Sequence, residues 1–252
     1  MKVQDARDGK KVVGTMLRML RNPGIALVAQ HSGLDFIMMD MEHGSYSLET
    51  VADICKVGRS AGLGCFVRVP ELSKAFVSRA LDCGVDGLMV PMTETVEQAE
   101  LLAGWSKFEP IGRRGLGSSG GHTDFAGTTD APALMEKANR ETMSIAQIET
   151  APAVDAVDDI AAVKGIDALL IGPNDLAISL GVPGKLTDPA MDKAIEKVAS
   201  AARREGKIFG MHASDVMLAK WQDHGLTLIM SSLDISMLGG AMKAISDRYK
   251  GV

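Results

Sequence analysis

Short apolar runs alternate with longer amphipathic stretches along almost the whole chain of 252 residues. Short apolar runs are typical of buried strands, and the stretches between them carry the periodicity and cap residues of helices. Eight strands are expected, at Val12–Met16, Phe36–Asp40, Gly64–Val69, Asp86–Val90, Met143–Ile148, Ala168–Ile171, Lys207–Met211 and Thr227–Ser231. The main helices are expected at 25–31, 47–60, 73–83, 94–105, 132–140, 152–163, 175–180, 189–205 and 214–224, with a last helix ending near Tyr249.

This alternation predicts parallel strands, and eight of them predict an α/β fold of the (β/α)8 TIM-barrel type, with residues 1–252 as one domain. A doubly wound open sheet is the alternative, but a nucleotide-type glycine loop is absent after the first strand. A glycine-rich segment, 112–122, interrupts the regular pattern and lacks the lysine of a phosphate-binding loop. It could be a mobile lid or an irregular connection, and His122 within it is expected to face solvent.

Composition and charge narrow the class of protein. The hydrophobic share of 46% and charged share of 23% are ordinary for a soluble globular chain, and the net charge of −5 suggests no nucleic-acid partner. No apolar run is long enough to span a membrane, and the polar N-terminus has no signal-peptide core. Three cysteines without a CxxC pair indicate reduced thiols, so we expect a cytoplasmic protein.

Two carboxylates stand out at the ends of neighbouring strands. Gln147 and Glu149 alternate along an apolar strand, so their side chains should point to the same side. A buried amide and carboxylate are costly unless a ligand or metal satisfies them. The next strand ends in Gly172-Pro173-Asn174-Asp175, which adds a second carboxylate. Two carboxylates on adjacent strand ends suit a hard divalent cation.

Other polar residues also follow the carboxyl ends of strands, where barrels of this kind place their active sites. They are Asp40, Glu42 and His43 after the second strand, Arg68 at the third, His212 after the seventh, and Ser231 and Asp234 at the eighth. Several have a structural alternative: Asp175 could cap a helix, Glu149 could pair with Arg68, His43 could be a satisfied polar residue, and His212 could merely line the mouth. A guanidinium buried within a strand, as at Arg68, needs an anion beside it.

The motifs around these residues resemble the metal-dependent class II pyruvate aldolases, the HpcH/HpaI family. They are Phe36-Ile37-Met38-Met39-Asp40-Met41-Glu42-His43-Gly44, Val67-Arg68-Val69-Pro70, Leu88-Met89-Val90-Pro91-Met92, Arg113-Arg114-Gly115, Gln147-Ile148-Glu149-Thr150 and Ile171-Gly172-Pro173-Asn174-Asp175-Leu176. They cover nearly the whole chain in the family's order. The resemblance implies a barrel with a swapped C-terminal helix, assembled as a homo-hexamer built from dimers.

The resemblance also implies a role for each site residue. Glu149 and Asp175 are the implied ligands of Mg²⁺, Mn²⁺ or Co²⁺, Arg68 the group that steadies an enolate, and His43 the base. Gln147 and the segment Gly172, Pro173 and Asn174 would hold the 2-oxoacid. Asp82 matches an aspartate that makes the histidine more basic, and Asp40, Glu42 and His212 are further candidates. Asn174 and the segment 117–125 depart from the family's pattern and leave the substrate open.

The expected reaction is the reversible addition of the enolate of pyruvate or hydroxypyruvate to an aldehyde, giving a 4-hydroxy-2-oxoacid. A Schiff-base aldolase would need a lysine at the carboxyl end of a strand, and Lys207 lies at the opposite end of its strand. Oxaloacetate decarboxylation or another 2-oxoacid lyase reaction is the alternative on the same site. A non-catalytic oxoacid-binding protein is the alternative of a different class.

Overall fold

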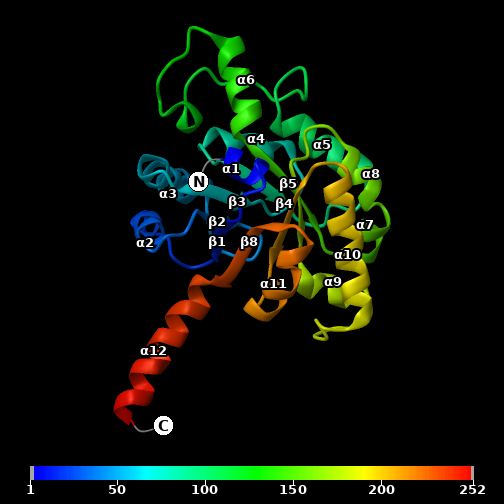
Figure 1. The fold of residues 1–252 in the computed structure, drawn as a ribbon. Coiled ribbons are helices and arrows are strands. Elements are labelled where there is room, and N and C mark those ends of the chain that lie inside the picture. The colour runs from blue at the N-terminus through cyan, green and yellow to red at the C-terminus, as the bar shows by residue number, and fades with distance from the viewer. Residues whose placement is uncertain (1–2, 251–252) are drawn as a thin grey trace.

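A closed barrel of eight parallel strands forms the centre of the protein, which is described here by a computed structural model covering residues 3–250 (Figure 1). The strands follow one another around the barrel in sequence order, and β8 pairs with β1 to close it. They are β1 (Val12–Leu17), β2 (Phe36–Asp40), β3 (Gly64–Arg68), β4 (Gly87–Val90), β5 (Met143–Ile148), β6 (Ala168–Ile171), β7 (Ile208–His212) and β8 (Leu226–Leu233). The predicted (β/α)8 barrel is therefore confirmed, and the open sheet is excluded.

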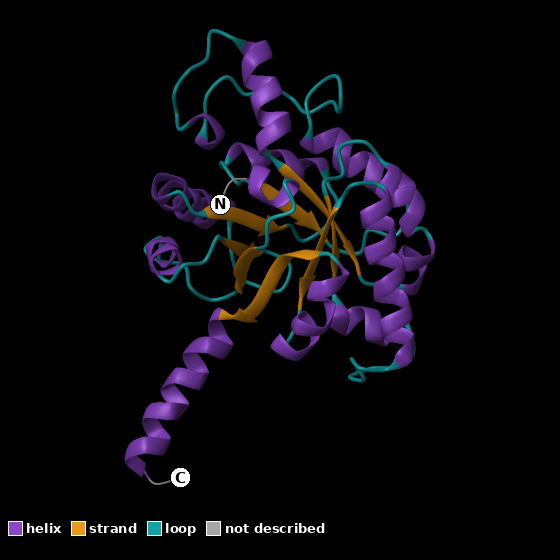
Figure 2. Cartoon of the chain, viewed as in Figure 1, coloured by secondary structure: helices purple, strands orange, loops and turns teal. Residues whose placement is uncertain are grey.

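Helices connect successive strands on the outside of the barrel (Figure 2). They are α2 (Ile25–His31), α3 (Leu48–Ala61), α4 (Lys74–Asp82), α5 (Val96–Ser106), α6 (Ala131–Glu141), α7 (Ala151–Asp155), α8 (Val157–Ala162), α9 (Pro173–Ser179), α10 (Pro189–Arg204) and α11 (Asp215–Trp221), with 3₁₀ turns η1 (Gly121–Thr123) and η2 (Gln222–His224). The helix expected at 152–163 is two short helices, because the backbone of Ala156 leaves the helical conformation, with φ −88° and ψ 2°. A short first helix, α1 (Val3–Arg7), was not expected from the polar N-terminus.

The core has two layers, separated by the strands themselves. Methionines such as Met38 and Met89 fill the barrel interior around Phe36 and Phe66, whose rings meet edge to face at 5.4 Å. Gly87 leaves room for one of these rings, because a Cβ there would lie 2.4 Å from the Phe66 ring. A larger aliphatic cluster lies between the strands and the surrounding helices. The flexible methionine side chain suits such an irregular interior.

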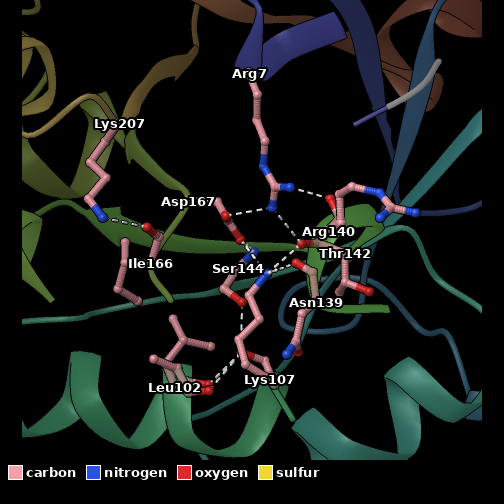
Figure 3. Close-up of polar contacts among 12 residues, drawn as sticks. Arg7, Leu102, Lys107, Asn139, Arg140, Thr142, Ser144, Ile166, Asp167 and Lys207 are labelled. Carbon is pink, nitrogen blue, oxygen red and sulfur yellow. Dashed lines mark hydrogen bonds and ion pairs between the residues drawn. The ribbon is translucent and has the colours of Figure 1, made fainter. Parts of the chain in front are cut away.

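A charged network closes the amino-terminal end of the barrel (Figure 3). Arg7 of α1 donates from Nη2 to Asp167 Oδ1 at 2.7 Å, and the fully buried Lys107 places Nζ 2.7 Å from Asp167 Oδ2. Lys107 also donates to the carbonyl of Thr142 at 2.5 Å. Burial lowers the pKa of Lys107, although Asp167 opposes that shift. The network is a structural cap, because it satisfies charged groups that the barrel end would otherwise leave buried and unpaired.

The last helix, α12 (Asp234–Lys250), leaves the barrel and projects away from it (Figure 1). Asp234 is its only buried residue within the described chain. Ile235, Met242, Ile245 and Tyr249 are exposed and recur at helical spacing on one face. Among residues 3–250, no helix has the length and apolarity needed to cross a membrane.

Candidate active site

Asp40 is the buried centre of a polar cluster at the carboxyl ends of the strands. Arg68 binds both of its oxygens, with Nε 2.9 Å from Oδ1 and Nη2 2.7 Å from Oδ2. Arg18 donates from Nε to Oδ2 at 2.7 Å, and the backbone N–H groups of Glu42 and His43 donate to Oδ1 at 3.1 and 3.2 Å. Burial alone would raise the pKa of Asp40, but Arg68 and the other donors outweigh it and hold the pKa below its usual range. Asp40 is therefore an anion.

Arg68 is the buried guanidinium that needed an anion, and it has two of them. Besides Asp40, it reaches Glu42, with Nη1 2.9 Å from Oε2. Glu42 in turn lies 3.8 Å from Nε2 of His43, whose side chain is 52% exposed. The alternative in which Glu149 is the direct partner of Arg68 is not what the structure shows. The turn after β2 thus places Glu42 and His43 beside the guanidinium delivered by β3.

Gln147 and Glu149 lie on the same side of β5 and its end, as their alternation predicted. Gln147 donates from Nε2 to Glu149 Oε2 at 2.5 Å, while the other carboxylate oxygen accepts the N–H of Met92 at 2.9 Å. Burial raises the pKa of Glu149 to about 7; the Met92 N–H opposes this shift, and the charges of Asp175 and Glu42 reinforce it. Oε1 of Gln147 is buried without a hydrogen-bond partner among the described residues.

Gly172, Pro173, Asn174 and Asp175 form the junction between β6 and α9. A Cβ at Gly172 would lie 2.2 Å from Glu149 Oε2 and 2.6 Å from Gln147 Nε2, so only glycine allows β6 to approach these groups so closely. Gly172 and Pro173 are buried, Asn174 is exposed and Asp175 is half-buried. Asp175 is in the first turn of α9, whose N-cap is Gly172, so it is not the N-cap residue.

This donor set fits a hard cation. The buried carboxylate of Glu149 is near the charge of Asp175, and the unpaired Oε1 of Gln147 lies beside it. These are the oxygen donors that Mg²⁺ or Mn²⁺ prefers, and a cation here would favour the ionised form of Glu149. Within residues 3–250, no group of three or more His, Cys, Asp or Glu side chains is arranged to hold a metal ion.

His212 lies at the end of β7 on the edge of the same cluster. Its Nε2 is 3.0 Å from the carbonyl oxygen of Ser232, which fixes the ring. Burial lowers the pKa of His212; the Ser232 contact opposes this shift, and the positive charges of Arg68 and Arg18 add to it. The neutral ring can serve as a polar wall of the site.

Asp82 is not brought to this cluster. It ends α4, which returns from the mouth to the amino-terminal face, and its Oδ1 lies 2.8 Å from Nη2 of Arg114 and 4.0 Å from Nδ1 of His122. His122 is largely buried, so the expectation that it faces solvent was wrong. Its loop packs Gly121 closely against the backbone at Cys83, so the glycine-rich segment does not form a lid over its own barrel mouth.

Two residues complete the site without a clear sequence signal. Asp234 accepts the backbone N–H groups of Arg18, Met19 and Leu20 at 3.0, 2.9 and 2.8 Å, and so holds the chain that leaves β1. In the sequence, Asp234 is only one of several acids at the ends of strands. Arg18 follows β1 in a basic, apolar stretch that does not distinguish it from its neighbours. Its position directly after the first strand is the signal that distinguishes it, since the other charged site residues also follow strand ends.

Comparison with known proteins identifies the family. The family model described as HpcH/HpaI aldolase/citrate lyase matches residues 16–228 of this chain. The chain belongs to the HpcH/HpaI aldolase family. It is 36% identical over 235 residues to the 4-hydroxy-2-oxovalerate aldolase of Novosphingobium aromaticivorans, which covers 90% of this chain and 86% of that one. It is 30% identical over 232 residues to the 5-keto-4-deoxy-D-glucarate aldolase of Escherichia coli (strain K12), covering 92% and 90%.

A solved member of the HpcH/HpaI family has the same fold. The crystal structure of the HpcH/HpaI aldolase from Desulfitobacterium hafniense DCB-2 superimposes with a TM-score of 0.91 at 32% identity, covering 97% of this chain and 96% of that one. This HpcH/HpaI family member is therefore an enzyme, a lyase of the aldolase type that acts on small molecules. Aldolases of this family are generally dependent on a divalent metal ion, which agrees with the donor set of Glu149, Asp175 and Gln147.

Proposed function

We propose that the protein catalyses the reversible addition of pyruvate or hydroxypyruvate, through its C3 carbon, to an aldehyde. The observation that carries this proposal is the pairing of two groups at one barrel mouth. One group, Gln147 with Glu149 and Asp175, offers oxygen ligands. The other, Arg68 with Asp40 and His43, offers positive charge and a histidine.

A divalent ion at Glu149 and Asp175, of the Mg²⁺, Mn²⁺ or Co²⁺ type, would supply Lewis acidity toward the carboxylate and ketone oxygens of a bound 2-oxoacid. Gln147 and the buried backbone at Gly172 and Pro173 form the wall against which the 2-oxoacid rests, with Asn174 at its exposed edge. Arg68 keeps its positive charge beside the C3–C2–O segment, where negative charge develops when a C3 proton leaves. Because two carboxylates fix the guanidinium, it is oriented before the substrate arrives.

His43 is the proposed base that takes the C3 proton. Its ring is half-exposed, so it can reach a substrate and exchange its proton with water. Asp40 fixes the turn that carries His43 by accepting its backbone N–H. In the addition direction the protonated ring returns the proton to the aldehyde oxygen as the carbon–carbon bond forms. Lys207 is not placed for a Schiff-base route, because its Nζ donates to the carbonyls of Val163 and Ile166 at the opposite end of the barrel.

We also propose a homo-oligomer, a hexamer built from dimers in which α12 is exchanged, in the cytoplasm. The apolar face of α12, with Ile235, Met242, Ile245 and Tyr249 exposed, supports such an exchange. Asp82 is proposed to assist a histidine of a neighbouring subunit, since its own contacts are Arg114 and His122, away from His43.

The decisive experiment follows the C3 hydrogens of pyruvate in D₂O by NMR, with the wild-type enzyme and each of the three metal ions. Loss of the C3 signal, abolished by EDTA and by His43→Ala, is the expected result. Formation of a 4-hydroxy-2-oxoacid after addition of an aldehyde completes the assignment. An enzyme that exchanges no C3 hydrogen with any of the ions, or that is fully active after exhaustive chelation, would refute the proposed chemistry.

A further inference from the structure

Arg18 is a second guanidinium at the mouth of the barrel, and it has no role in the proposed reaction. It directly follows β1, and Asp234 holds its backbone N–H at 3.0 Å. Its side chain is 29% exposed and contacts Asp40 only through Nε, at 2.7 Å. Within residues 3–250, Arg18 donates no hydrogen bond from Nη1 or Nη2. The outer edge of the guanidinium, which carries four N–H donors, is therefore unused.

Most of the charge compensation of Asp40 comes from donors other than this second guanidinium. Arg68 already binds both of its oxygens, and two backbone N–H groups add to Oδ1. Arg68 itself is held on a second side by Glu42. The ion-pair partner of Arg18 is Asp40, which it shares with Arg68. Most of the Arg18 side chain is shielded from solvent, so its positive charge is only partly compensated. Such a charge is most stable when a second anion binds its free edge.

We infer that Arg18 binds a carboxylate carried by the acceptor aldehyde, so that the natural acceptor is an aldehyde acid rather than a neutral aldehyde. This inference rests on the proposed function. A guanidinium can bind a carboxylate through two parallel hydrogen bonds, which fixes the direction of the acceptor as well as its position. Arg18 and Arg68 share Asp40, so the acceptor's carboxylate is bound a short distance from the group that steadies the reacting carbon.

The carboxylate of the acceptor serves only for binding, and none of its bonds changes in the reaction. The bond formed joins C3 of the 2-oxoacid to the aldehyde carbon, and the aldehyde oxygen receives the proton that left C3. Arg18 contributes by placing the aldehyde carbon against C3, which is a contribution of orientation. The expected product is a 4-hydroxy-2-oxo dicarboxylic acid.

The test compares kcat/KM for aldehyde pairs of similar size, one anionic and one neutral: glyoxylate against glycolaldehyde, and succinic semialdehyde against butanal. We expect the wild-type enzyme to prefer the anionic member at least tenfold. Arg18→Gln should abolish most of that preference. Because a ratio is measured, any common effect on the 2-oxoacid cancels. Arg21→Gln is the matched control, since Arg21 is exposed on the same loop and binds Ser45 Oγ at 2.5 Å.

Failure of the inference can be told from failure of the proposed function. If the wild-type enzyme exchanges the C3 hydrogens of pyruvate but shows no preference for anionic aldehydes, or if Arg18→Gln retains the wild-type preference, Arg18 does not bind the acceptor. If C3 exchange is absent, the proposed function fails first. Should Arg18→Gln not fold, Arg18→Lys keeps the charge but loses the fork, and it should lower the preference without reversing it.

Discussion

The carboxylate of Asp40 shows how the site depends on single side chains. It accepts hydrogen bonds from Arg68, from Arg18 and from two backbone N–H groups while having no solvent exposure. A buried carboxylate is stable only when its charge is compensated in this way. The same compensation keeps Arg68 in a fixed orientation. Asp40 therefore links two properties: the position of the Arg68 charge that assists the reaction, and the stability of the barrel mouth.

Arg68→Lys tests the value of this fixed orientation. Lysine keeps the positive charge but cannot bind both oxygens of Asp40 in a planar fork. We expect kcat to fall by roughly a hundredfold, on the scale of losing one donor to a developing oxyanion. Steady-state kinetics on folded protein, checked by circular dichroism, would measure this. Turnover close to wild type would mean that Arg68 has only a structural role.

The raised pKa of Glu149 predicts a pH dependence for metal binding. Its value of about 7 means that below pH 7 an incoming ion must displace a proton. Apparent affinity should therefore fall about tenfold for each pH unit below 7 and level off above it. In the metal-free protein the sign is opposite: the contribution of Glu149 to stability is complete below the ordinary glutamate pKa and is lost as pH rises through about 7. Calorimetric titration of Mn²⁺ at pH 6, 7 and 8 measures the first effect, and Glu149→Gln should remove the dependence.

At the residue scale, the sequence predicted relations along one strand better than relations between strands. The shared side of Gln147 and Glu149 follows from the two-residue period of a strand, and the structure confirms it. The pairing of Arg18 with Asp40 spans 22 positions and depends on the rotamers of a long side chain. No periodicity contains that information. The catalytic and ligand roles of the site residues stay predictions.

The junction of β6 and α9 shows how an element positions chemistry. The strand ends at Ile171, the helix begins at Pro173, and Gly172 between them packs against Glu149 and Gln147. Proline at the first helical position needs no N–H partner, which suits an abrupt start. The helix then presents Asp175 in its first turn. Closeness of the backbone at Gly172 thus sets the distance between the two proposed ligands.

Gly172→Ala should disturb both proposed ligands while leaving the barrel intact. The added methyl group would overlap Glu149 Oε2, so the carboxylate must move. We expect metal affinity and kcat/KM to fall at least tenfold, with only a modest decrease in melting temperature. Gly115→Ala is the control, because a Cβ at Gly115 meets nothing within 4 Å. Equal metal affinity in the two variants would show that this close approach is not needed.

All eight strands could be predicted from the sequence because each is a short apolar run bounded by turn residues. Two features could not. The break at Ala156 has no glycine or inserted proline to mark it, and α1 consists of five mostly polar residues that become helical by docking on the barrel. Tertiary contacts decide such short segments, since isolated helices of this length are not stable.

On the scale of the whole molecule, the exposed apolar face of α12 predicts association between subunits. Met242→Lys with Ile245→Lys places two charges on that face, and we expect the mass in solution to fall. Light scattering after size exclusion measures it. Ser236→Lys is the control, because Ser236 is exposed on the opposite side of the helix. A wild-type protein of single-chain mass would contradict the exchange of α12.

Asp82 makes a separate prediction about the assembly. If it assists His43 of a neighbour, Asp82→Ala and His43→Ala chains, each with little activity, should regain activity when mixed. Mass spectrometry must first confirm that subunits exchange. Mixed oligomers that remain inactive would show that Asp82 acts only within its own subunit, through Arg114.

The contact of Arg7 with Asp167 has a consequence for how the protein is made. It joins residues 160 positions apart, so α1 emerges from the ribosome long before its partner exists. At about 5–20 residues per second, that interval is roughly 8–32 seconds of synthesis. During this time the first helix has nothing to dock on, and its apolar side chains are open to chaperones or to proteolysis. Resistance of the N-terminus to cleavage in nascent chains therefore reports when the far side of the barrel has formed.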